Sequence, residues 1–73
     1  MWTFEDTEGG RWDVVVGRES WGALYALFIP RGEGGVRQTP LAAASHEEAM
    51  QEVEEAGGEG LRELFRRSEP KPQ

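Results

Sequence analysis

Residues 2–16 read WTFEDTEGGRWDVVV, and this stretch gives the strongest indication of the fold because large apolar side chains alternate with other residues on both sides of a glycine pair. Successive side chains of a strand point to opposite faces, so apolar residues at every second position share one face of a two-stranded ribbon. Five side chains follow this spacing: Trp2, Phe4, Trp12, Val14 and Val16. Gly9 and Gly10 supply the positive φ angles of a tight turn. The stretch predicts a β-hairpin whose apolar face the rest of the chain must cover.

A second apolar run, WGALYALFI at residues 21–29, has two readings. Read as a helix, it places Trp21 and the residues three, four and seven positions later on one face; read as a strand, it is apolar on both faces, with small alanines between large side chains. We favour the strand, because the run is short, has aromatic and β-branched residues near its end, and is bounded by Gly22 and Pro30.

A return strand is expected over residues 36–43, after a flexible turn with the sequence RGEGG at residues 31–35. The strand carries Pro40, which has no backbone N–H to donate to a neighbouring strand. We therefore expect it to lie at an edge of the sheet.

The chain continues with the signals of two helices. Ser45 can accept a hydrogen bond from the backbone of Glu48, whose side chain can reach back in a capping box. Helical spacing then predicts a buried stripe made of Ala49, Met50, Val53 and Ala56. Gly57 and Gly58 supply the left-handed residue that commonly closes a helix.

The second, shorter helix is predicted from Leu61, Leu64 and Phe65, which again fall at positions i, i+3 and i+4. Glu63 lies three and four positions before Arg66 and Arg67, a spacing that favours surface ion pairs.

These elements define an α+β fold: a three- to four-stranded antiparallel sheet in the order β-β-β-β-α-α, with the C-terminal helices packed on one face. We expect one domain over residues 1–68 and a disordered tail over 69–73. A domain this short buries only roughly 60% of the surface its unfolded chain exposes. The chain has no cysteine, so disulfides and thiolate metal sites cannot staple it, and self-association is the remaining common means of stabilisation.

The formal net charge of −6 is concentrated in one segment. Between Ser45 and Glu59 the sequence contains no lysine or arginine but six carboxylates: Glu47, Glu48, Glu52, Glu54, Glu55 and Glu59. Direct nucleic-acid binding is disfavoured, because affinity for phosphate comes mainly from clustered basic residues. There is neither a secretory signal nor an apolar run long enough to span a membrane, so we expect a soluble, cytoplasmic protein without membrane contact.

Catalytic, cofactor and metal motifs are not evident. His46 is the only histidine and stands at the start of the acidic helix, without a nucleophile signature or a second nitrogen or sulfur ligand near it. The glycines of residues 31–35 lack both the P-loop lysine and the dinucleotide-binding spacing. We therefore expect a protein that is not an enzyme, with no cofactor and no metal.

Two features are candidates for protein interaction. Trp21 stands at the break before the second apolar run; it is either an interaction hot spot or, the reading we lean towards, part of a small core that needs aromatic mass. Helical spacing places four carboxylates on one flank: Glu48, Glu52, Glu55 and Glu59.

The leading hypothesis is a small non-enzymatic interaction module that self-associates, as a dimer, through a face or edge of its sheet and Trp21. The alternative is an acidic inhibitor or antitoxin-like adaptor that presents the glutamate-rich helix to a basic site on a partner.

The layout is similar to that of the MbtH-like proteins, small acidic adaptors of nonribosomal peptide synthetase adenylation domains, which also run from a hairpin through a third strand to a C-terminal helix. The likeness rests on Phe4-Glu-Asp6, Val14-Val-Val16 and Ser20-Trp21. The family's Trp-Pro and Pro-x-Gly-Trp elements are missing, since Trp21 precedes Gly22 and Pro30 precedes Arg31-Gly32-Glu33. Those tryptophans shape the family's partner-binding surface, so we do not transfer its function.

Overall fold

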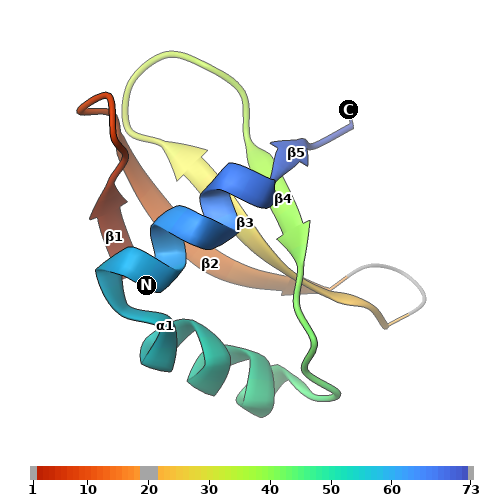
Figure 1. Ribbon diagram of the computed structural model, residues 1–73. Helices are drawn as coiled ribbons and strands as arrows, with labels where there is room; N and C mark the ends of the chain where they lie inside the picture. The colour runs from red at the N-terminus through yellow and green to blue at the C-terminus, as the bar shows by residue number, and fades with distance from the viewer. Residues whose placement is uncertain (1, 19–21, 73) are drawn as a thin grey trace.

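The computed structural model describes residues 2–18 and 22–72, which form a sheet with a bent helix across one face (Figure 1). The sheet is antiparallel throughout, and its five strands lie side by side in chain order. The strands are β1 Trp2–Glu5, β2 Arg11–Arg18, β3 Leu24–Pro30, β4 Arg37–Pro40 and β5 Glu69–Pro70, and α1 spans His46–Arg67. The α+β class and the antiparallel sheet are as the sequence predicts.

The predicted β1–β2 hairpin is confirmed, with Trp2 opposite Val14 and Phe4 opposite Trp12. Gly9 has a φ of 85°, whereas Gly10 has no positive φ. All five alternating side chains lie in the hydrophobic core or pack against it. The apolar face of the hairpin is therefore the inner face of the sheet, which α1 covers.

The run at residues 21–29 is a strand from Leu24 onward, so its helical reading is wrong. Burial along β3 alternates strictly at first: Leu24, Ala26 and Phe28 are buried on the inner face, while the residues between them are half-buried. Two-residue periodicity of burial is what a strand covered on one face produces.

The helix α1 is two helical arms joined at Gly57, which has non-helical angles of φ 65° and ψ −173°. We call residues 46–56 the first arm and residues 58–67 the second arm; Figure 1 shows the bend between them. The predicted break at the glycine pair is thus confirmed. The Ser45 cap is also confirmed, since Ser45 Oγ accepts a hydrogen bond of 3.1 Å from the Glu48 backbone N–H. The Glu48 side chain reaches back to the N–H of Ala44 instead of that of Ser45.

The predicted stripe of the first arm is right at Ala49 and Val53, which are buried, and wrong at Met50, which is 39% exposed. Ala56 is half-buried against the core. The first arm contacts the sheet through a narrower stripe of residues than helical spacing predicts. The arm ends after three turns, and only the residues along its central line reach the strands.

The second arm supplies the rest of the core. Leu61 and Leu64 are buried, and Phe65 packs against three aromatic rings, with centroids 4.6 Å from Trp12, 5.4 Å from Phe4 and 5.3 Å from Phe28. The contacts with the two phenylalanines are edge-to-face, the favourable arrangement for aromatic pairs.

The tail predicted to be disordered from Glu69 instead forms β5, which pairs with Arg37 and Gln38 of β4. The Arg37 guanidinium donates to the backbone oxygen of Ser68 at 2.6 Å and to its Oγ at 3.0 Å, and the Lys71 N–H donates to the Val36 carbonyl. These bonds hold a segment that is too short and polar to order itself. The strand β4 is therefore the fourth of five strands, and the prediction that it lies at the edge of the sheet is wrong. Pro40 is still tolerated in β4, because it lies beyond the end of β5 and needs no backbone N–H for pairing.

Candidate functional site

The face of the sheet opposite α1, which we call the outer face, is apolar at its centre. Pairing places four apolar side chains on it, and we call these the outer patch: Val15, Tyr25, Leu27 and Ile29. Three of them are half-buried, Ile29 is 37% exposed, and none belongs to the core cluster or packs against it. The only helix of the described residues lies on the other side of the sheet.

Leu27 occupies the centre of the outer patch. The strand β3 is the middle strand of the sheet, and Leu27 is the middle residue of β3, opposite Val15 on one side and Gln38 on the other. Its side chain lies over Gly17: a Cβ added to that glycine would be 2.7 Å from Leu27 Cδ1. Because Gly17 has no side chain, Leu27 can lie flat on the sheet, and its side chain extends the apolar surface along β2.

Charged residues of both signs flank the outer patch, at its Ile29 end and at the β5 edge of the sheet. Arg31 Nε donates to Asp13 Oδ1 at 2.8 Å, and Glu5 lies opposite Arg11 on the neighbouring strand. Glu69 of β5 is exposed at the other side of the sheet. An apolar centre with a charged rim is the common anatomy of a protein-interaction surface.

Trp21, the candidate hot spot, lies outside the described residues. Its placement in a core or on a surface stays a prediction, as does its part in any contact.

The four glutamates predicted to share one helix flank do not lie on one continuous helix, because the bend at Gly57 separates Glu59 from the other three. Glu48 and Glu55 are exposed and Glu52 is half-buried on the first arm, where Glu55 also accepts a hydrogen bond from Gln51. Helical spacing predicted a single stripe since it assumes an unbroken axis, which the glycine interrupts.

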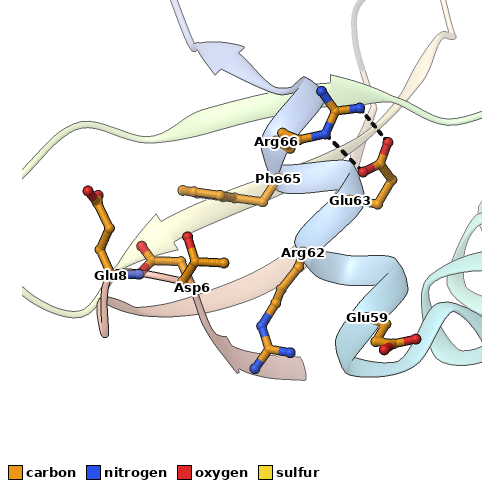
Figure 2. A pocket seen from close by; sticks show the side chains of 8 residues that line it. Asp6, Glu8, Glu59, Arg62, Glu63, Phe65 and Arg66 are labelled. Atoms are coloured by element: carbon orange, nitrogen blue, oxygen red, sulfur yellow. Dashed lines mark hydrogen bonds and ion pairs between the residues drawn. The ribbon is translucent and has the colours of Figure 1, made fainter.

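A hollow of about 570 Å³ lies between the β1–β2 turn and the second arm of α1 (Figure 2). Charged side chains surround the ring of Phe65, namely Asp6, Glu8, Glu59, Arg62, Glu63 and Arg66. Both basic residues of this lining already have partners: Arg66 binds Glu63 through both carboxylate oxygens, and Arg62 Nε donates to the Glu5 carbonyl at 2.9 Å.

Hydrogen bonds lower the pKa of two carboxyl groups in this hollow, those of Asp6 and Glu63. The Trp12 indole N–H and the Gly10 and Glu8 backbone N–H groups lower the pKa of Asp6. Hydrogen bonding by Arg66 lowers the pKa of Glu63. A general acid working near neutral pH needs its carboxyl pKa raised, so neither residue is suited to that role.

The other residues considered in the sequence for catalysis or ligand binding are His46 and the glycine-rich loop at residues 31–35. His46 is exposed at the start of the first arm, and residues 31–35 form an exposed loop. Within residues 2–18 and 22–72, no three His, Cys, Asp or Glu side chains are grouped so that they could hold a metal ion.

Two features of the candidate site were not predicted residue by residue from the sequence. Asp6 organises the β1–β2 turn, a role indicated by an aspartate ahead of a glycine turn, since such side chains bind backbone N–H groups two residues on. The outer patch was signalled by Val14-Val15-Val16 and by the two-sided apolar run, which predict a strand that is apolar on both faces.

Comparisons with protein-family models, with curated proteins and with solved structures give no match for this chain. In the described part of the chain, no helix combines the length and the apolar character needed to cross a membrane.

Proposed function

We propose that this chain is a small non-enzymatic protein-interaction module that self-associates through its sheet, with Trp21 contributing to the contact. The observation that carries the proposal is the outer patch, an apolar centre on a sheet face that no described helix covers. Antiparallel sheets that face water on one side normally carry polar residues there. Val15, Leu27 and Ile29 break that rule on adjacent strands.

Covering the outer patch with a partner is energetically favourable compared with leaving it in solvent. Burying apolar surface contributes roughly 25 cal/mol per Å² removed from water, and large contiguous apolar patches mark surfaces that contact a protein, a membrane or a ligand. A domain of 73 residues has a small core, so covering a second sheet face would add a large share to its stability.

An acidic inhibitor or antitoxin-like adaptor is the second candidate function. Its support is the first arm of α1, where Glu47, Glu48, Glu54 and Glu55 are all exposed. A partner with a basic groove would be steered towards this arm, and that attraction would be screened by salt. Glu59 would contribute less than sequence spacing predicts, because it belongs to the second arm.

The experiment that separates the two candidates is size-exclusion chromatography with light scattering at low and at near-molar salt. We expect a dimer at high micromolar concentration that persists at near-molar salt, since apolar contacts are not screened. Trp21→Ala is expected to weaken it. A strict monomer at both salt concentrations would contradict self-association and direct the search to a foreign partner for the acidic arm.

A further inference from the structure

We infer that the partner of the outer face is a second copy of this chain, with the two sheets stacked face to face and the two α1 helices on the outside. This inference rests on the proposed function, because it presupposes self-association. It adds how the two copies are arranged, which residues meet at the twofold axis, and why the occupant is the same chain.

The distribution of charge favours a second copy at this face. The helix α1 carries seven glutamates and three arginines, so most of the net charge of −6 belongs to the helical layer. The rim of the outer face is nearly neutral, with Arg11 and Arg31 against Glu5, Asp13 and Glu69. Two such rims can pair opposite charges across a twofold axis, which a rim of one sign could not do.

Face-to-face stacking also keeps the acidic helices apart. The described Cα atoms span 32 × 29 × 19 Å, and the short dimension matches a layer of sheet plus a layer of helix. The sheet layer or the helix layer alone is already thicker than the Debye length of about 8 Å at physiological salt. Repulsion between the helices of two stacked copies is therefore largely screened, whereas contact through the helices would bring the like charges together.

The sheet edges offer little room for the other mode of self-association, pairing of strands edge to edge. At one edge, β1 has four residues, and Arg62 occupies the carbonyl of its last residue, Glu5. At the other edge, β5 has two residues, one of which is Pro70 and lacks an N–H. Short, covered or proline-bearing edges resist strand pairing, so the face is the surface left for a second copy.

The size of the face suits a dimer. A standard interface buries about 800 Å² on each partner, and the broad side of the molecule, with extents of 32 and 29 Å, is large enough to provide it. Stacked sheets pack about 10 Å apart with their side chains interdigitated. Leu27, at the centre of the face, is then nearest the twofold axis and close to its own copy.

The absence of cysteine from the sequence allows a direct test with single-cysteine variants. Leu27→Cys places a thiol at the centre of the outer face, and Glu55→Cys is the matched control, exposed on the first arm of α1. Both full-length variants are treated at micromolar concentration with a short bismaleimide cross-linker, after circular dichroism has shown that they are folded. Covalent dimers are quantified over time.

We expect Leu27→Cys to cross-link about a thousandfold faster than Glu55→Cys, because thiols held in one complex meet at a millimolar effective concentration instead of the micromolar concentration of free protein. If light scattering shows a dimer but Leu27→Cys reacts no faster than Glu55→Cys, the stacked-sheet arrangement is overturned while self-association stands. If the protein is a monomer throughout, self-association itself fails, and the inference fails with it.

Discussion

Asp6 shows how one side chain can organise a turn. Its Oδ1 accepts hydrogen bonds from the backbone N–H groups of Glu8 at 2.9 Å and Gly10 at 2.7 Å, and its Oδ2 accepts one from the Trp12 indole at 2.9 Å. The turn is closed by a backbone bond of 2.8 Å from the Asp6 N–H to the Gly10 carbonyl. The same carboxylate thus shapes the loop and orients a tryptophan that packs against Phe65.

These hydrogen bonds make the stability of the hairpin depend on pH. They lower the pKa of Asp6 below its ordinary value of 3.8. The carboxylate therefore stabilises the folded state fully above pH 3.8, and this contribution is lost as the pH falls through the lowered, folded-state pKa. We expect wild type to lose more stability between pH 5 and 3 than Asp6→Asn, whose side chain does not titrate, as measured by urea unfolding. Equal losses in the two proteins would contradict this role of Asp6.

At the scale of elements, Gly57 sets the course of the polypeptide between the two arms of α1. Its φ of 65° and ψ of −173° fall in a region that essentially only glycine adopts. The bend allows Val53 of the first arm and Leu61 and Leu64 of the second to reach the same core. A straight helix of 22 residues would extend about 33 Å and could not cover so small a sheet with both ends.

We expect Gly57→Ala to destabilise the fold by about 1–3 kcal/mol, the usual cost of forcing a residue with a Cβ into such a conformation. Gly58→Ala is the matched control, because Gly58 has no positive φ and open space where a Cβ would lie. Alanine there is expected to be neutral or stabilising by up to about 1 kcal/mol. Urea unfolding of both variants checks the prediction, and equal effects would show that the bend does not depend on glycine.

The attachment of β5 depends on Arg37. Its guanidinium binds the backbone oxygen and the Oγ of Ser68, and Ser68 is only 7% exposed. We expect Arg37→Ala to cost about 1–3 kcal/mol, because buried hydrogen-bond acceptors lose a charged donor. Faster hydrogen exchange at the Lys71 amide, which donates to Val36 in the wild type, would accompany the loss. Unchanged exchange at Lys71 would mean that β5 is held without Arg37.

At the scale of the whole molecule, one sheet has an apolar face that α1 covers and another that no described helix covers. If a second copy covers the outer face, folding and dimerisation are linked, and the unfolding midpoint must rise with protein concentration. We expect each tenfold increase in concentration to stabilise the wild-type dimer by about 1.4 kcal/mol per mole of dimer.

The Leu27→Glu variant supplies the control for that measurement. It would place an unpaired carboxylate at the centre of the stacked faces, where burial of a charge is costly, yet in a monomer the side chain can remain in water. The unfolding midpoint of Leu27→Glu is therefore expected to be independent of concentration. A concentration-dependent midpoint in this variant would locate the dimer contact on another surface.

Much of the fold was predictable from local patterns in the sequence. Alternation around Gly9 predicted the first hairpin and its inward-facing aromatic residues, and Ser45 and Gly57 predicted where the helical segments begin and break. These signals are reliable because each depends on neighbouring residues alone: a two-residue period, a capping side chain, or a backbone conformation that only glycine adopts.

Other features of the fold depend on contacts between residues that are distant in sequence, and local patterns do not predict them. The chain segment after Ser68 is ordered because Arg37, distant in sequence, binds it, and Met50 is exposed because the bent helix reaches the sheet along a narrow line. The residues of β3 are enough to make this strand apolar on both sides. That α1 covers one side and leaves Leu27 at the centre of the other follows from packing, because one helix of this length, bent at Gly57, has room to pack on a single face.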